Sequence, residues 1–282
     1  MKRGSWTHVA ALHAFLVVAC VFTLYPVLWV IKMALSPTET LSLSANPFPE
    51  HVTFEHFTAV LGAHGTKGEW LFGRQLLNSI LVSGATTLVG LVLAVSAAYA
   101  ISRFKFPGKE AGLQSLLITQ MFPATLMLVP LYALLEKLHL LDSLSGLVLV
   151  YSTSSLPFCV WMLKGYFDTL PRELEEAAIM DGASQWQVFI KVVLPLARPA
   201  LAVTALFSFM TAWNEFILAA TLLNDAARFT LPVALQRYVG EYKTEWGNFA
   251  AGALLVSAPV MALFFALQKQ LVGGLTTGGV KG

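Results

Sequence analysis

A polar stretch over residues 168–199, called the polar loop below, holds the side chains whose types and spacing favour a specific interaction. Within it, Glu173, Glu175 and Glu176 follow a proline in the segment 171–180. Carboxylates stabilise the first turn of a helix, and proline is tolerated there, so we expect a helix over 171–180. These carboxylates can form ion pairs and hydrogen bonds at a surface. The polar loop is therefore a candidate docking surface.

A turn and a second helix are predicted to complete the polar loop. Asp181-Gly182 supplies the turn, because glycine adopts a positive φ without strain, and Ser184 is placed to cap the next helix. An apolar stripe with helical spacing then precedes Pro195, made of Trp186, Phe189, Ile190 and Val193. We predict a helix-turn-helix with one apolar face. The same pattern also fits an amphipathic pair that lies on a membrane or packs against its own bundle.

Polar side chains inside apolar stretches form a second candidate site. An ionisable group in lipid is costly and tends to face a cavity or a partner. Asn214 and Glu215 lie in one such stretch, and Tyr132 and Tyr151 lie in two others. These residues either line a translocation path or gate, or they hold helices together by hydrogen bonds. The pattern alone does not separate the two readings.

The sequence contains no recognisable arrangement of catalytic or metal-binding residues. It lacks the GxxxxGK[ST] phosphate loop, the HExxH zinc motif and the dinucleotide fingerprint. The two cysteines, Cys20 and Cys159, fall inside apolar runs without metal-site spacing, and we interpret them as small buried side chains. We therefore expect no catalytic site, no metal and no cofactor in this chain.

The composition is that of an integral membrane protein. Hydrophobic residues make up 56% of the 282 positions and charged residues only 12%, whereas about a quarter of the residues in soluble proteins are charged. The net charge of +2 gives no reason to expect nucleic acid as a partner. A lipid bilayer is the expected surrounding of most of the chain.

Six apolar stretches are long enough to cross the hydrocarbon core, which takes about 20 helical residues. They cover residues 9–31, 76–101, 113–135, 144–167, 200–223 and 249–267. The first stretch is longer than the apolar part of a signal peptide and lacks a convincing cleavage site, so we expect a retained helix. The whole chain, residues 1–282, is thus predicted to be a single all-α transmembrane domain.

The short loops between these stretches indicate an orientation, because lysine and arginine gather on the cytoplasmic side. Such residues follow the second stretch and occur in the polar loop: Arg103, Lys105, Lys109, Arg172, Lys191 and Arg198. We expect these loops, both termini and a tail over residues 268–282 in the cytoplasm. The loop over residues 224–248 is expected outside.

The polar loop also carries a family signature. Glu176-Ala177-Ala178, Asp181-Gly182-Ala183 and Leu194-Pro195 resemble the EAA loop of ATP-binding-cassette (ABC) importer permeases. The segment SFMTAWNEFILAATLL over residues 208–223 and the final residues GLTTGGVKG are similar to the smaller permease of maltose importers, the MalG type. The resemblance implies a six-helix, MetI-like permease fold in the inner membrane of a bacterium or archaeon, with a cytoplasmic coupling helix in the polar loop.

The resemblance further implies roles for individual residues. A groove of a cytoplasmic ATPase would receive Glu176, Ala177, Ala178, Asp181, Gly182, Ala183, Leu194 and Pro195. The interface of the ATPase dimer would receive the tail residues Gly273, Gly274, Gly278, Gly279 and Lys281. An external sugar-binding protein would meet Gln236, Tyr238, Gly240 and Tyr242, although tyrosines here also suit anchoring at the membrane interface.

The implied partners are a second permease subunit, two copies of an ABC ATPase, an external sugar-binding protein and a sugar of the maltose or maltodextrin class. ATP and magnesium would be held by the ATPase. This chain would form half of the translocation path and couple ATPase closure to alternating access. Two other functions stay open: an ion-coupled secondary transporter or channel with Glu215 as its ion site, and a non-conducting membrane scaffold for an ATPase.

Overall fold

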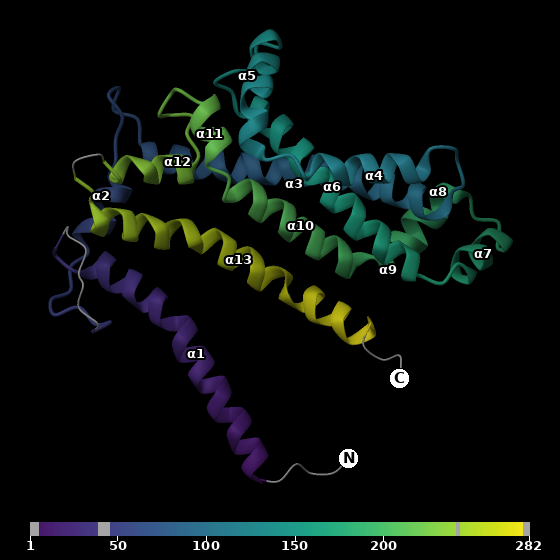
Figure 1. Cartoon of the computed structure of the whole chain (residues 1–282), viewed down its shortest axis with the longest axis horizontal. Coiled ribbons are helices and arrows are strands. Elements are labelled where there is room, and N and C mark those ends of the chain that lie inside the picture. Colours follow the sequence, from purple (N-terminus) through teal and green to yellow (C-terminus); the bar gives the residue numbers. More distant parts are fainter. Residues whose placement is uncertain (1–5, 39–45, 241–242, 279–282) are drawn as a thin grey trace. The chain divides into compact units, whose positions relative to one another are not determined.

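The computed structural model describes residues 6–38, 46–240 and 243–278, which form helices joined by turns and loops (Figure 1). Within these ranges two isolated bridges occur and no sheet. The longest helices are α1 (Trp6–Leu35), α3 (Leu71–Arg103), α6 (Leu144–Thr169), α10 (Arg198–Trp213) and α13 (Trp246–Gly278). Shorter elements are α2 (Glu55–Leu61), α4 (Lys109–Thr119), η1 (Ala124–Met127), α5 (Leu128–Lys137), α7 (Glu173–Met180), α8 (Gln185–Val188), η2 (Phe189–Val193), α9 (Leu194–Leu196), α11 (Ile217–Leu222), α12 (Leu231–Leu235) and η3 (Gln236–Tyr238).

Several of these helices can cross a bilayer. In the described part of the chain, α1, α3, α6 and the Trp246–Gln270 part of α13 are long and apolar enough. A fifth span results if the bent pair Gln185–Leu196 and Arg198–Trp213 is counted as one. Length and composition therefore support a multi-pass membrane protein, while the count of six spans stays a prediction.

The third predicted span, residues 113–135, is not one continuous helix. It comprises most of α4, a break around Pro123, the short η1 and most of α5. Proline has no backbone N–H and disfavours helical backbone in the residue before it, so an α-helix ends where Pro123 follows.

The fifth predicted span, residues 200–223, is also interrupted. Helix α10 ends at Trp213 and α11 begins at Ile217. The Glu215 carboxylate between them accepts hydrogen bonds from the first free N–H groups of α11, at 2.8 Å from Leu218 and 3.1 Å from Ala219. A side chain that caps a new helix start in this way replaces the backbone bonds of a continuous helix.

One compact unit comprises Arg74–Val233 and Pro259–Gly282. Its core lies between α3, α6 and α10, where Ala94 and Leu163 are fully buried. An ideal Cβ at Gly90 would lie 3.4 Å from the hydroxyl of Ser155 on α6 and 3.6 Å from that of Ser208 on α10. Small residues at such a crossing let membrane helices pack backbone to backbone. These three helices carry the polar loop.

A second unit comprises Met1–Gly73 and Ala234–Ala258. Its α2 carries His56, which is buried and lies between three chain segments. The ring Nδ1 is 2.9 Å from the side-chain oxygen of Asn248, and Nε2 is 2.9 Å from the carbonyl of Ser36. The imidazole thereby joins the end of α1, the helix α2 and the start of α13.

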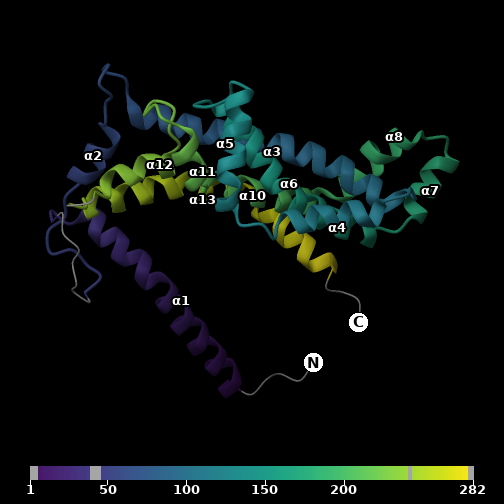
Figure 2. The same cartoon turned by 45° about the horizontal axis from the view of Figure 1, so that its top comes forward.

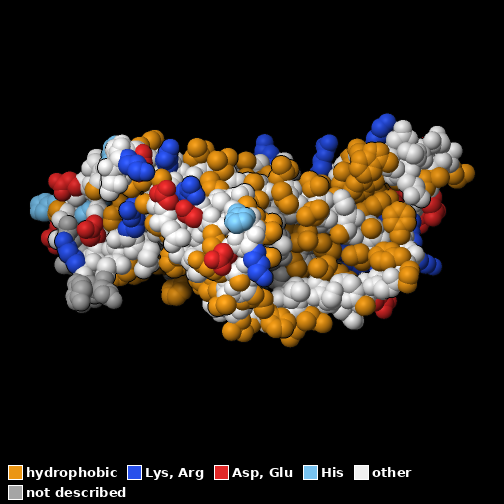
Figure 3. All heavy atoms as spheres, turned by 90° about the horizontal axis from the view of Figure 1, so that it is seen from above, with side chains coloured by type: hydrophobic (Ala, Val, Ile, Leu, Met, Phe, Trp, Pro, Cys, Tyr) orange, Lys and Arg blue, Asp and Glu red, His pale blue; other side chains and the backbone are white. Residues whose placement is uncertain are grey.

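Hydrophobic side chains cover much of the surface seen in Figure 3. Large apolar residues stay exposed on several helices, among them Phe22 at 81%, Val129 at 78% and Leu88 at 66%. Soluble monomers rarely expose apolar surface on this scale. Contact with lipid or with other membrane subunits accounts for it.

Candidate functional site

The predicted helix-turn-helix of the polar loop is present at one end of the unit that holds α3, α6 and α10 (Figures 1 and 2). Helix α7 ends at Met180, and Gly182 then adopts a φ of +86°, the left-handed region that favours glycine. Ser184 and Gln187 form a capping box, in which each side chain accepts a hydrogen bond from the other residue's N–H. The predicted turn at Gly182 and cap at Ser184 are confirmed.

The second helix of the polar loop contains a π turn. Residues Phe189–Val193 are π-helical, and α9 continues the helix as far as Leu196. Pro195 has no N–H to donate to the carbonyl four residues earlier, so the regular α pattern cannot pass through it. The helix axis then bends by 76° into α10.

The apolar stripe of this helix differs from the predicted one. Val188, Phe189 and Val193 are buried, whereas Trp186 is 68% and Ile190 41% exposed. Trp186 precedes the π turn on α8. Ile190 lies within the π turn, which takes more residues than an α turn and so changes the regular helical spacing. The prediction of a single apolar face made of Trp186, Phe189, Ile190 and Val193 is therefore wrong.

The residues of the family signature surround the turn. Glu176, Ala177, Asp181, Gly182 and Pro195 are exposed, and Ala178, Ala183 and Leu194 are half-buried. Ala178 and Ala183 pack against the core, and the Ala183 N–H donates to the Ala178 carbonyl at 3.0 Å. Their small side chains hold the turn close to the bundle and leave the backbone open on the outer side.

Large apolar side chains on both sides of the turn are exposed. They are Ile179 and Met180 before it and Trp186 after it, at 49%, 89% and 68% exposure, and we call the three together the tip patch. Carboxylates of Glu176 and Asp181 lie next to it in the sequence. An exposed apolar patch with a polar rim is typical of a surface that binds another protein. Sequence reasoning missed Ile179 and Met180, although apolar residues in the last turn of a polar helix were the available signal.

The base of the polar loop is attached to α3 and α6 by charged groups. Arg103 on α3 donates to Glu175 on α7, with 2.5 Å between Nε and Oε1. Ser102 donates to Asp168 at 2.6 Å, and Lys164 on α6 donates to the other oxygen of the same carboxylate at 2.7 Å. Hydrogen bonds to ionised groups are the strong ones. The Arg103–Glu175 pair fixes the start of α7 to α3, and the Ser102–Asp168 bond joins α3 to the end of α6.

The predicted path residues fall into two groups. The Tyr151 hydroxyl donates to Glu215 at 2.6 Å, and Tyr151 is 3% exposed, so this pair joins α6 to the start of α11. Asn214 instead donates to the Met210 carbonyl of its own helix at 2.9 Å. Tyr132 lies on α5 and is 40% exposed. The structure therefore brings Tyr151 and Glu215 together and gives Asn214 and Tyr132 other surroundings.

The predicted external site is partly described. Gln236 and Tyr238 lie in η3, Gly240 follows, and Tyr242 lies outside the described residues. Gln236 and Gly240 are exposed, whereas Tyr238 is half-buried. Burial, and after it the Glu245 carboxylate, raises the pKa of the Tyr238 hydroxyl. This phenol is therefore neutral and can both donate and accept a hydrogen bond.

Comparison with known proteins identifies the family. Residues 87–276 match the family described as binding-protein-dependent transport system inner membrane component. This chain belongs to that permease family. The permease is 37% identical over 263 residues to the trehalose transport system permease protein SugB of Mycobacterium tuberculosis (strain CDC 1551 / Oshkosh), a match covering 93% of each chain. It is 38% identical over 300 residues to the maltose/maltodextrin transport system permease protein MalG of Vibrio vulnificus (strain YJ016), covering 100% of this chain and 97% of the relative.

Solved structures share the fold of the permease. A chain of a bacterial ABC transporter involved in the import of the polysaccharide alginate superposes with a TM-score of 0.76 at 24% identity, covering 95% of this chain and 98% of that one. A chain of the inward-facing MetNI methionine ABC transporter superposes with a TM-score of 0.59 at 18% identity, covering 74% and 98%. The permease therefore has the MetI-like fold. Its relatives are permease subunits, which are not enzymes.

Helix α13 extends past residue 267, the predicted end of the sixth span. The predicted tail began at residue 268, but α13 continues through Gly273 and Gly274 to Gly278. Apolar residues after the predicted end of the span, Leu271-Val272 among them, extend the helical run in the sequence. Gly279 and Lys281 lie outside the described residues.

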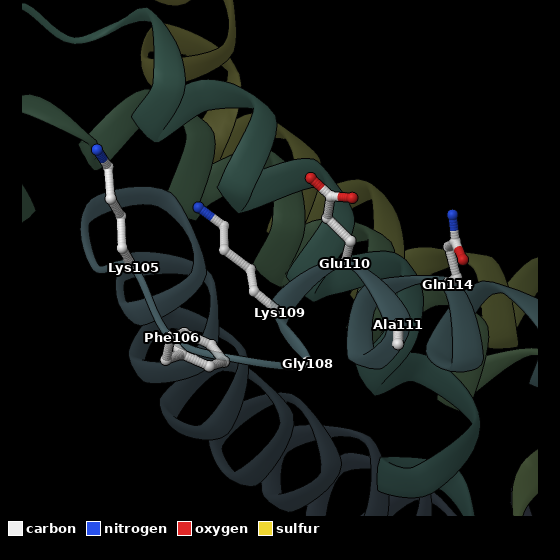
Figure 4. A pocket seen from close by; sticks show the side chains of 7 residues that line it. All are labelled: Lys105, Phe106, Gly108, Lys109, Glu110, Ala111 and Gln114. Carbon is white, nitrogen blue, oxygen red and sulfur yellow. The ribbon is translucent and has the colours of Figure 1, made fainter.

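An open hollow of about 630 Å³ lies at the start of α4 (Figure 4). Its lining residues are Lys105, Phe106, Gly108, Lys109, Glu110, Ala111 and Gln114. In the close-up the amino groups of Lys105 and Lys109 point to the same side as the Glu110 carboxylate. The hollow is open and built from surface side chains, so it provides a charged edge rather than an enclosed binding site. In the described part of the permease no group of three His, Cys, Asp or Glu residues could hold a metal ion.

Proposed function

We propose that this permease is a subunit of an ATP-driven, binding-protein-dependent sugar importer, and that α7 with the turn at Gly182 is the coupling helix that docks on the ATPase. The tip patch carries this proposal. Met180 is 89% exposed on a short helix whose base is held by the Arg103–Glu175 pair. An apolar tip on a firmly attached helix suits insertion into a groove, because the helix is ordered before it binds.

In this proposal the permease crosses the membrane six times. The two interrupted stretches, α4 with α5 and α10 with α11, are the third and fifth spans. Broken helices are tolerated at membrane depth where protein satisfies the freed backbone groups, as Glu215 does at the start of α11. Arg103, Lys105 and Lys109 favour a cytoplasmic location of the end that carries α7, and with it both termini.

The sugar class is proposed from the relatives, whose names give maltose, maltodextrin and trehalose as their substrates. We propose an oligosaccharide of this kind for this permease, delivered by an external binding protein. On the outer side, the exposed Gln236 and the neutral hydroxyl of Tyr238 offer hydrogen bonds to that protein or to its sugar. The glycines from Gly273 to Gly279 and Lys281 form the segment proposed to approach the ATPase dimer.

The proposed mechanism is alternating access driven by the partner. ATP and magnesium bind two ATPase copies, and closure of that dimer displaces both coupling helices, one on this chain and one on a second permease. Because α7 is bonded to α3 and the second helix of the polar loop bends into α10, a displacement of α7 turns the membrane helices. Each permease then supplies half of the path.

An ion-coupled transporter with Glu215 as its ion site is disfavoured by the contacts of that carboxylate. Both oxygens already accept hydrogen bonds, from Tyr151, Leu218 and Ala219. A group that is satisfied in this way holds helices together.

Purification from the native membrane in mild detergent, followed by mass spectrometry of the co-purifying proteins, tests the proposal. We expect an ABC ATPase, a second permease and a sugar-binding protein. The Met180→Glu variant should lose the ATPase and keep the second permease, whereas Phe106→Glu, at another exposed apolar residue, should keep both. A wild-type chain that purifies alone contradicts the proposed function.

A further inference from the structure

The three glutamates at the start of α7 differ in their surroundings. Glu173 and Glu176 are exposed, but the Glu175 side chain is only 12% exposed. Negative charge at a helix start is favourable at any of these positions. Only Glu175 has lost most of its contact with water, so its role differs from that of its two neighbours.

Each oxygen of Glu175 is bound by a residue of α3. Oε1 accepts from the Arg103 Nε at 2.5 Å, and Oε2 accepts from the Tyr99 hydroxyl at 3.0 Å. The Arg103 side chain is 7% exposed and spreads its other nitrogens to Ser102 at 3.1 Å and to the Leu170 carbonyl at 3.2 Å. A planar guanidinium can hold several fixed acceptors at once. It therefore joins α3, the α6–α7 connection and α7.

The Tyr99 ring extends this contact to the other helices. Its centroid lies 4.6 Å from that of Phe189 in η2 and 6.0 Å from that of Phe167 in α6. One residue of α3 thus contacts both helices of the polar loop, by a hydrogen bond to α7 and by ring packing on η2. Helix α3 is itself a candidate membrane span.

We propose that Tyr99, Arg103 and Glu175 form a joint through which a displacement of α7 is transmitted to α3, so that Glu175 is a positioning residue of transport and not a contact of the ATPase. The inference rests on the proposed function of α7. Ion pairs shielded from solvent are screened little by salt, and removing one partner leaves the other charge unsatisfied. The joint therefore holds α7 and α3 together while the ATPase displaces the polar loop.

The test uses the assembled importer in proteoliposomes and measures sugar taken up per ATP hydrolysed. Glu175→Gln keeps the shape of the side chain and removes its charge, and Glu110→Gln is the matched control, an exposed glutamate in the first turn of α4 and outside the proposed docking helix. We expect Glu175→Gln to assemble and to hydrolyse ATP, with sugar uptake per ATP clearly lowered. Glu110→Gln should match the wild type.

A milder variant keeps the test decisive if Glu175→Gln does not fold. Tyr99→Phe retains the ring contacts and removes only the hydroxyl, so it should fold and lower uptake per ATP several-fold. The proposal is overturned if the assembled Tyr99→Phe or Glu175→Gln complex takes up as much sugar per ATP as the wild type. The same conclusion holds if a variant gives less complex but the complex that forms has the wild-type ratio. A wild-type complex without ATP-dependent uptake would instead refute the proposed function.

Discussion

Substitution of Gly182 tests whether backbone strain at the turn impairs docking, because the same strain can be introduced at a glycine outside the polar loop. Gly182 has a φ of +86°, and an ideal Cβ built on it meets no atom within 4 Å. A substitution therefore costs backbone strain and no steric clash inside the permease. Gly108, at the start of α4, has a φ of +82° and equally open surroundings. It is the matched control outside the polar loop.

The expected cost follows from this geometry. A non-glycine residue in the left-handed region costs roughly 1–2 kcal/mol, and asparagine tolerates it better than alanine. Gly182→Ala and Gly108→Ala should therefore be destabilised equally. At Gly182 the strain lowers the fraction of permease whose turn has the geometry needed for docking. A change of one or two kcal/mol alters an equilibrium of this kind by a factor of about 5–30.

ATP-dependent sugar uptake by the reconstituted complex is the assay, with thermal unfolding in detergent as the measure of stability. We expect Gly182→Ala to lower uptake by about 5- to 30-fold and Gly108→Ala to leave it near wild type at the same loss of stability. Gly182→Asn should recover part of the uptake, because asparagine relieves the strain. If alanine is better tolerated than asparagine at Gly182, bulk at the docking surface and not strain decides, and the reasoning is refuted.

Two further predictions concern packing. Tyr151→Phe removes the hydroxyl that donates to Glu215, and a lost hydrogen bond to a charged group costs about 1.5–3 kcal/mol of stability. Thermal unfolding of the purified permease should show a lowered midpoint. An unchanged midpoint would argue against the hydrogen bond. Gly247→Ala places a Cβ against the imidazole of His56 and should destabilise by about 1–3 kcal/mol through overpacking. Gly84→Ala, at a helical glycine with open surroundings, is its control, and equal stability of the two variants would contradict the packing of His56 on α13.

Local features of the polar loop were predictable from the sequence. The helix start behind Pro171, the positive φ at Gly182 and the cap at Ser184 each depend on residues within one or two turns. Propensity and capping act over that distance, so a single sequence contains the information. The permease family was likewise predictable, because its signature lies in the same short segment.

Features that depend on distant residues were not predictable. In the sequence Glu175 is one of three similar glutamates. Its burial arises from contacts with Arg103 and Tyr99, which lie more than seventy positions earlier in the chain. Phe189 and Val193 are buried in the core with residues of α3 and α6, whereas Trp186 of the same predicted stripe stays exposed. Long-range packing decides both, and hydrophobic pattern alone does not encode it.

Sugar uptake by proteoliposomes that contain the purified complex, with and without ATP and with all ion gradients collapsed, tests the central claim most directly. The account predicts that uptake of maltose or trehalose requires ATP, the ATPase and the binding protein, and that it continues without an ion gradient. Uptake by this chain alone, driven by an ion gradient and abolished by Glu215→Gln, would contradict it.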